Sequence, residues 1–213
     1  MALQNRVTPF GEIVATEARG SLMGNRGCLH DDRRQLGRRR WTTKAWVACL
    51  LAFKDRPPRR LMQPGHYAEL FFLDEATALS AGHRPCAQCR YAAYRRFAEA
   101  WAAGANRTGE RVSAAEMDRA IHAERVDGAR GSRTFAASLA DLPDGTMIAM
   151  DGTAYLKQAD ALRPWSLSGY GPPLGAPVSE ASVTVLTPRP IVEAIRAGYR
   201  TDVHATAYAT ALS

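Results

Sequence analysis

The stretch from Phe71 to Arg90 reads FFLDEATALSAGHRPCAQCR and combines signals for a strand, a helix, a turn and a pair of cysteines. Its aromatic pair ends an apolar run, HYAELFF, that predicts a strand. Asp74 stands where an N-cap would begin the helix EATALSA, and Gly82 stands where a left-handed residue would end it. A second, amphipathic helix is expected over Cys89–Ala102. The cysteines at 86 and 89 should therefore lie in a tight turn between two helices.

A Cys-x-x-Cys pair can be a redox site, half of a zinc site, or two buried thiols. A redox pair of the thioredoxin kind opens a helix that follows a strand, where the helix dipole lowers a thiol pKa. Here the pair follows a helix, a glycine and the tripeptide HRP. Zinc takes four nitrogen or sulfur ligands in a tetrahedron, and one Cys-x-x-Cys turn supplies two of them. We therefore predict zinc as the cofactor, with Cys86 and Cys89 as ligands and not as a redox couple.

The other two zinc ligands have several candidates. All four cysteines of the chain lie within its first 90 residues, so Cys28 and Cys49 are expected to complete the site. These two cysteines do not form a second close pair, however. The sequence therefore keeps three histidines as alternative ligands: His30, His66 and His83.

The stretch from Phe71 to Arg90, with a looser extension through Cys49, resembles the second half of the metal-binding domain of Ada-type DNA repair proteins. The shared features are an aromatic pair, an acidic helix start, Ala-Gly, and then Arg-Pro-Cys-x-x-Cys. The resemblance implies a domain that binds zinc through four cysteines and holds DNA with nearby basic residues. By position, Cys86 and Cys89 match the family's second ligand pair, and Cys49 lies where the first pair would be expected.

The sequence departs from that family at the first ligand pair. In the family this pair is a close C-x3-C motif, one of whose cysteines accepts a methyl group from a DNA phosphotriester. Around Cys49 the sequence is WVACLLAF, with no second cysteine. The resemblance therefore implies metal-supported nucleic-acid binding in DNA repair or regulation, and an alkyl-accepting cysteine protein remains an alternative. Residues 110–213 show no family resemblance.

Positive charge is concentrated near the start of the chain. Residues 1–60 carry 13 of the 28 Lys and Arg but only 5 of the 21 Asp and Glu, in a chain of 213 residues with a net charge of +7. A localised basic field attracts polyanions, and nucleic acid is the commonest of them. We therefore predict a nucleic-acid partner, with DNA in first place; the alternative is a solvated arginine-rich loop. The predicted phosphate contacts lie in the run DDRRQLGRRRWTTK or beside the cysteines: Arg33, Arg34, Arg38, Arg39, Arg40, Lys44, Arg84, Arg90 and Arg95.

Aromatic and glycine residues accompany the basic run. Trp41 and Trp46 flank its end and could stack on unpaired bases, although core packing is the commoner role for a residue placed as Trp46 is. The motif MGNRG, residues 23–27, has two glycines around an arginine. Such a motif could let backbone amides approach a phosphate, although a simple turn is its commoner use.

Two other classes of function remain open. The sequences HDD, at His30–Asp32, and HAER, at His122–Arg125, offer groups that could hold a divalent cation, so a metal-dependent nuclease or hydrolase is one alternative. On a helix, however, residues two apart face different sides, which separates the histidine and the glutamate of HAER. The aspartates of HDD could simply pair with neighbouring arginines. The third class is a protein-interaction module with structural zinc, and the sequence favours a binding protein over an enzyme.

The chain is expected to adopt an α+β fold, in which a small N-terminal part with a zinc knuckle packs against a β-rich C-terminal part. Residues 1–105 form the basic, metal-binding part, 106–133 a helical connector and 134–213 the β-rich part, unless the three make one continuous domain. Strands are expected at 10–16, 46–53 and 181–187. A capping box at Ser113 predicts a helix, Asp-Gly at 144–145 and 151–152 predicts hairpins, and Pro190 and Gly198 bound a last helix.

The sequence contains no segment suited to a membrane. No run approaches the roughly 20 apolar residues of a membrane span. The first 14 residues lack the apolar stretch of a signal peptide, and four cysteines are too few for a secreted disulfide scaffold. We therefore expect a cytoplasmic protein without a membrane partner, and the oligomeric state is left open.

Overall fold

The N-terminal half of the chain is built on a mostly antiparallel sheet. The computed structural model describes residues 2–54, 60–128, 131–175 and 181–209. Within them the sheet has the order β2-β1-β5-β3-β4-β6, and its parallel pairs are β1 with β5 and β4 with β6. Its strands are β1 (Gln4–Val7), β2 (Ile13–Ala15), β3 (Leu22–Asn25), β4 (Val47–Leu50), β5 (Leu70–Phe72) and β6 (Arg84–Pro85). Strands therefore form at all three predicted runs of this half, and β1, β3 and β6 are additions.

A second, antiparallel sheet forms within residues 135–185, where the sequence predicts a region rich in strands. Its order is β13-β12-β11-β10-β15-β9, with β14 paired to β12. Its strands are β9 (Phe135–Ser138), β10 (Met147–Met150), β11 (Thr153–Gln158), β12 (Ala161–Ser166), β13 (Gly169–Tyr170), β14 (Leu174–Gly175) and β15 (Ser182–Val185). A short ribbon, β7 (Val126–Asp127) with β8 (Gly131–Ser132), precedes it.

One of the two predicted hairpins forms. Asp151 and Gly152 join β10 to β11 with φ of 47° and 76°, the left-handed pair that a two-residue hairpin turn requires. Asp144 and Gly145 instead make a turn that leads into β10. The prediction of a hairpin there is wrong, because the preceding strand, β9, pairs with β15 and not with β10.

Four α-helices form among the described residues, with the predicted caps. They are α1 (Glu75–Ser80), α2 (Tyr91–Gly104), α3 (Ala114–Arg125) and α4 (Arg189–Arg196), followed by the 3-10 turn η2 (Ala205–Tyr208). Asp74 accepts a hydrogen bond from the backbone N–H of Thr77 at 2.9 Å, and Ser113 accepts one from Glu116. Gly82 and Gly198 follow their helices with φ of 86° and 106°. None of these helices is long and apolar enough to cross a membrane.

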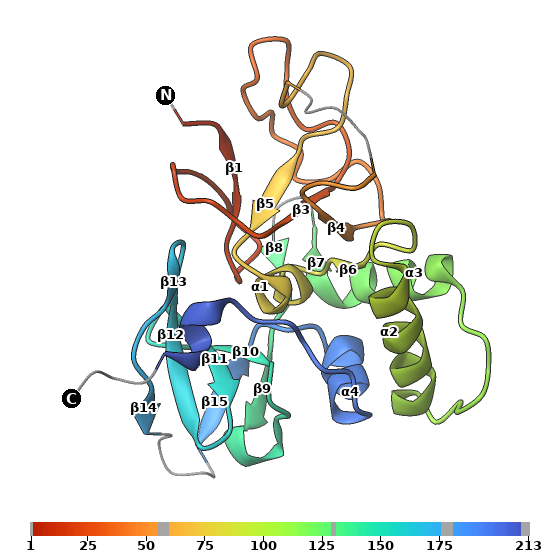
Figure 1. Ribbon diagram of the computed structural model, residues 1–213, viewed down its shortest axis with the longest axis vertical. Helices are drawn as coiled ribbons and strands as arrows, with labels where there is room; N and C mark the ends of the chain where they lie inside the picture. Colours follow the sequence, from red (N-terminus) through yellow and green to blue (C-terminus); the bar gives the residue numbers. More distant parts are fainter. Residues whose placement is uncertain (1, 55–59, 129–130, 176–180, 210–213) are drawn as a thin grey trace.

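The hydrophobic cores join segments that are far apart in the sequence. Phe97 and Trp101 of α2, Met117 of α3 and Ile191 of α4 belong to one buried cluster, so α3 is part of the core and not only a connector. Ala76 of α1 belongs to another, together with Met147 and Leu156 of the second sheet. Figure 1 shows α1 between the two sheets. The packing therefore does not divide at residues 105 or 133.

Two adjacent carboxylates at the start of α1 tie these parts together. The Asp74 side chain accepts hydrogen bonds from the hydroxyl of Tyr170 at 2.7 Å and from the backbone N–H of His204 at 2.9 Å. Glu75 accepts one from the hydroxyl of Tyr199 at 2.7 Å and pairs with Arg90 at 2.7 Å. Both carboxylates are buried. The second sheet and the C-terminal segment are thus fastened to one short helix.

We expect Asp74→Ala to lower the free energy of unfolding by about 3 kcal/mol, since it removes a helix cap and leaves buried donors without an acceptor. Urea unfolding measures this loss. Asp32→Ala is the matched control, because Asp32 is exposed, and it should change the free energy of unfolding by less than about 0.5 kcal/mol. Equal stability of the two variants would contradict the role assigned to Asp74.

Candidate metal centre

Parallel pairing of β6 with β4 brings together cysteines that are 37 or more residues apart in the sequence. Ala48 of β4 is opposite Pro85 of β6, and the backbone N–H of Cys86 donates to the carbonyl of Ala48 at 3.0 Å. Cys86 therefore leaves the sheet beside Cys49. The chain then turns, with the N–H of Arg90 bonded to the carbonyl of Cys86 at 3.2 Å, and Cys89 returns toward the same place.

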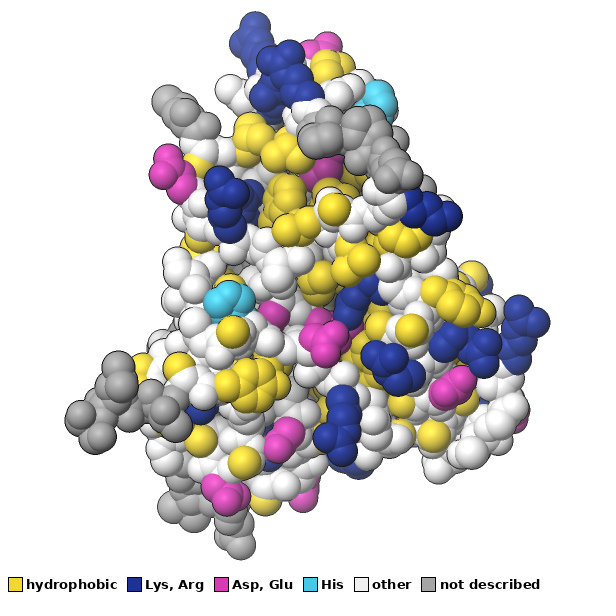
Figure 2. All heavy atoms as spheres, in the orientation of Figure 1, with side chains coloured by type: hydrophobic (Ala, Val, Ile, Leu, Met, Phe, Trp, Pro, Cys, Tyr) yellow, Lys and Arg dark blue, Asp and Glu magenta, His cyan; other side chains and the backbone are white. Residues whose placement is uncertain are grey.

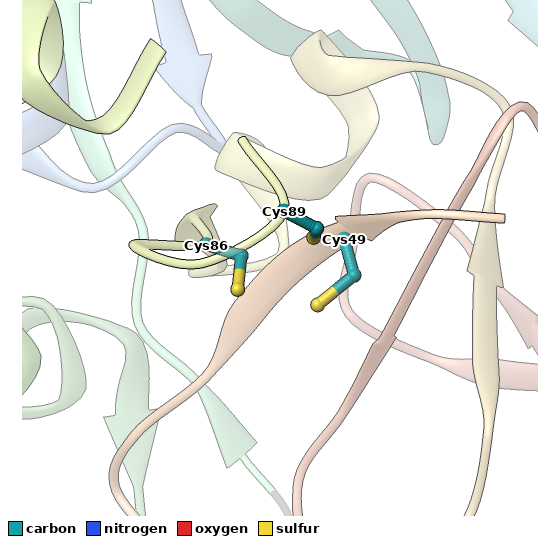
Figure 3. Close-up of side chains that lie close together, drawn as sticks. All are labelled: Cys49, Cys86 and Cys89. Atoms are coloured by element: carbon teal, nitrogen blue, oxygen red, sulfur yellow. The ribbon is translucent and has the colours of Figure 1, made fainter. Parts of the chain in front are cut away.

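The sulfurs of Cys49, Cys86 and Cys89 lie within 4.8 Å of one another. Figure 3 shows the three side chains converging, one from the strand and two from the turn. All three residues are half-buried. The backbone N–H of Leu50 donates to the sulfur of Cys89 at 3.4 Å, and that of Gln88 donates to the sulfur of Cys86 at 3.4 Å. Backbone donors thus face the cluster and favour its ionised form.

The electrostatics of the cluster favour a cation among the sulfurs. A hydrogen bond from the thiol of Cys49 lowers the pKa of Cys86, and the same bond raises the pKa of Cys49. Burial raises the pKa of Cys89. One thiolate therefore forms easily, and further ionisation is opposed by like charge unless a cation neutralises it.

The cysteine cluster fits a metal ion with sulfur ligands. A zinc–sulfur bond of about 2.3 Å sets the sulfurs of a tetrahedral site about 3.8 Å apart, which is compatible with this cluster. The three cysteines can therefore hold a metal ion, and three protein ligands leave one position of a tetrahedron for a further donor.

The remaining predicted ligands lie elsewhere. Cys28 is exposed, and its sulfur lies 3.9 Å from the carbonyl of His30, outside the cysteine cluster. His66 is exposed. His83 is buried between the rings of Trp46 and Phe72. Across residues 2–54, 60–128, 131–175 and 181–209, ligand side chains gather in a group of three or more only at Cys49, Cys86 and Cys89.

Two of the residues considered for a hydrolase site, Asp31 and His122, make structural contacts. The Asp31 carboxylate accepts the backbone N–H groups of Arg33 and Gln35, both at 2.9 Å, and so stabilises its own turn. The ring of His122 packs edge-on against Trp41, with ring centroids 4.4 Å apart. Within the described residues, neither HDD nor HAER contributes to a cluster of metal ligands.

Two of the arginines predicted to contact phosphate are buried in ion pairs. Arg84 donates two hydrogen bonds to Asp118 of α3, at 2.8 and 2.9 Å, and Arg90 pairs with Glu75 of α1. Their charges are neutralised inside the protein, so they do not extend the exposed basic surface. They flank Cys86 and Cys89 and hold that turn against two helices, so they support the position of these two cysteines.

The other predicted basic residues are accessible. Arg33, Arg38, Arg39 and Lys44 are exposed, while Arg34 and Arg40 are half-buried. They belong to the segment between β3 and β4, and Figure 2 shows Lys and Arg side chains gathered at that end of the molecule. No ion pair involves these six side chains in the part of the chain that the structure describes. Arg95 is also exposed and pairs with Glu99 at 3.3 Å.

Two buried arginines, Arg26 and Arg125, were missed by sequence reasoning as possible functional residues. The only sequence signal was the pair of glycines around Arg26 in MGNRG, and the HAER motif pointed to its histidine instead of Arg125.

No protein-family model, curated protein or solved structure matches the chain. The site is therefore interpreted from its own geometry.

We expect the purified protein to contain one metal ion, and Cys49→Ser, Cys86→Ser and Cys89→Ser each to reduce the content to well below one. Because folding and metal binding are coupled in such sites, a chelator should also lower the melting temperature. Elemental analysis and thermal unfolding measure both effects. Cys28→Ser is the matched control and should retain the metal. Loss of metal in Cys28→Ser, or an unchanged melt with chelator, would contradict this ligand set.

Buried His83 should make stability depend on pH. Burial lowers the pKa of His83 well below its usual value of 6.5, so the unfolded chain takes up a proton that the folded protein excludes. Stability is therefore lost as the pH falls below 6.5. When the pH falls from 7.5 to 5.5, the free energy of unfolding of the wild-type protein should decrease by about 1.4 kcal/mol more than that of His83→Phe. Urea unfolding at both pH values measures this, with His66→Gln as the exposed control that keeps the wild-type dependence.

Proposed function

We propose that this protein binds nucleic acid, with DNA as the first candidate, and that a zinc ion held by Cys49, Cys86 and Cys89 supports the binding segment. The observation that carries the proposal is the convergence of these three sulfurs within 4.8 Å on β4 and the turn after β6. The exposed basic segment between β3 and β4 leads directly into β4. A metal at the cysteines would therefore fix the strand on which that segment ends.

The choice of zinc rests on the donor set. Three thiolates suit a soft, closed-shell ion, and zinc is the common structural metal of Cys-x-x-Cys turns. When bound, zinc would cross-link β4 to the turn of Cys86 and Cys89 and neutralise the thiolates. Arg84 and Arg90 hold the same turn against α3 and α1. The resemblance of Phe71–Arg90 to the Ada-type metal-binding domain supports the same assignment.

The choice of nucleic acid rests on exposed charge. Arg33, Arg38 and Arg39 are exposed, and among the residues described here no carboxylate pairs with them. A planar guanidinium can donate two parallel hydrogen bonds to a phosphate, and each neutralised phosphate releases condensed counterion. Contacts of this kind bind the DNA backbone without reading bases, so these arginines are expected to position the protein on the DNA. The process that this binding serves is proposed to be DNA repair or regulation.

Binding to a fluorescent DNA duplex should weaken steeply with salt, and the variant Arg33→Ala/Arg38→Ala/Arg39→Ala should bind more weakly. Loss of three phosphate contacts would reduce the steepness of the plot of log association constant against log salt concentration by about 2 to 3. The loss of affinity should be similar for duplexes of different sequence. Titrations by fluorescence anisotropy at four salt concentrations, with single-stranded DNA and RNA for comparison, measure both quantities.

A control of equal charge change is Arg111→Ala/Arg119→Ala/Arg200→Ala, which removes three exposed arginines from other parts of the surface and should bind as the wild-type protein does. Equal weakening by the two triple variants would mean that net charge alone drives binding. No binding at low salt would overturn the proposal. Shortened DNA after incubation with Mg²⁺ or Mn²⁺ would favour the nuclease alternative instead.

A further inference from the structure

A cavity of about 600 Å³ lies apart from the cysteine cluster, beside the residues that lead into β2 and the ribbon of β7 and β8. Three arginines line it, Arg26, Arg40 and Arg125, with Trp41 and Trp46. Small-molecule sites commonly have volumes of about 300 to 1,000 Å³. The cavity is thus of a size to hold a small ligand, and its charged groups indicate which kind.

Two of these arginines are buried, and they have no counter-ion among the described residues. Arg26 is 3% exposed and Arg125 is 1% exposed. Their guanidinium groups donate to backbone carbonyls, Arg26 to Gly11 at 2.9 Å and Arg125 to Pro9 at 3.1 Å. The Nε atom of each is buried without a hydrogen-bond partner. The exposed Glu12 also lines the cavity, but in the described part of the chain no carboxylate forms an ion pair with either arginine.

Buried charges in proteins are ordinarily paired, because removing an ion from water costs several kcal/mol. Here burial lowers the pKa of Arg26 to about 9, with a smaller effect from the charges of Arg125 and Arg40. Burial likewise lowers the pKa of Arg125 to about 10. The cavity therefore presents concentrated positive charge that the described residues do not neutralise, and an anionic ligand would do so.

The surrounding backbone is shaped to place Arg125 there. Gly11 has φ of 84°, and a Cβ atom at this position would come within 2.8 Å of the Nη2 atom of Arg125. A Cβ atom at Gly82, where φ is 86°, would come within 3.0 Å of the Cγ atom of Arg125. The ring of Trp46 lies 4.4 Å from the Cζ atom of Arg26. Both guanidinium groups are thus held in place before any ligand binds.

We propose that this cavity binds the phosphate group of a phosphate monoester, with Arg26 and Arg125 in its interior and Arg40 at its half-buried edge. Guanidinium forks match the oxygens of a phosphate, and two or three positive charges match a dianion. The cavity is larger than an inorganic phosphate, so it has room for the group that the phosphate carries. Trp41, which is half-buried in the wall, offers a flat surface for a sugar or a base.

This site is separate from the metal centre and does not depend on the proposed binding of a nucleic-acid backbone. The phosphate monoester could belong to a free nucleotide or to the phosphorylated end of a nucleic acid. Both sources present the same chemistry to the arginines. The experiment therefore compares them directly.

Isothermal titration of the full chain tests the proposal with inorganic phosphate, AMP, adenosine, and a short oligonucleotide with and without a 5′-phosphate. We expect AMP to bind one-to-one and adenosine not to bind. Arg40→Ala should weaken AMP binding about ten-fold, which corresponds to one lost charge-assisted contact. Arg119→Ala, which removes an exposed arginine outside the cavity, should change the affinity less than two-fold. Arg26→Met and Arg125→Met should abolish binding where circular dichroism shows that they fold.

Equal affinity for AMP and adenosine would overturn the proposal, as would equal losses in Arg40→Ala and Arg119→Ala. Tighter binding of the 5′-phosphorylated oligonucleotide than of AMP would identify a nucleic-acid end as the source, and the reverse order would identify a free nucleotide. The result is independent of duplex binding. AMP binding without duplex binding would support this phosphate site and contradict the proposed binding of nucleic acid. Duplex binding without AMP binding would support the proposed binding of nucleic acid and contradict this phosphate site.

Discussion

The buried carboxylates of Asp74 and Glu75 are the constraint on which the rest of the structure depends. They begin a six-residue helix whose residues are all buried between the two sheets. The carboxylate of Asp74 caps the helix and accepts a hydrogen bond from the hydroxyl of Tyr170 in the second sheet. The carboxylate of Glu75 forms an ion pair with Arg90 and accepts a hydrogen bond from the backbone N–H of Asp202. Since buried acceptors must be satisfied, these bonds leave the surrounding segments little choice of position.

The positions of the three cysteines in the candidate metal centre depend on Glu75 and on a second buried ion pair. Arg90 ends the turn of Cys86 and Cys89 and is fixed by Glu75, while Arg84 begins it and is fixed by Asp118. The ladder between β4 and β6 then places Cys49 against the turn. Two ion pairs and a strand pairing therefore hold the sulfurs close together, so a metal ion need not organise the turn by itself.

Arginine has three different environments in this protein, and each implies a different chemistry. Arg84 and Arg90 are buried and paired, which makes them structural. Arg38 and Arg39 are exposed, so they are accessible to a polyanion. Arg26 and its partner in the cavity, Arg125, are buried with their charge uncompensated by the described residues, which favours a small anionic ligand. Composition and net charge treat all of these side chains alike, although their environments separate them.

The sequence by itself determined the local features. The cap at Asp74 and the left-handed residue at Gly82 depend on neighbours within a few residues, so their residue types were enough to predict them. Only the tertiary structure decided that Cys49 lies against Cys86 and Cys89 while Cys28 does not, and that Arg125 is buried beside a cavity. These outcomes depend on strand pairing and packing between segments that are tens of residues apart, and a residue's identity does not encode which distant partner it will meet.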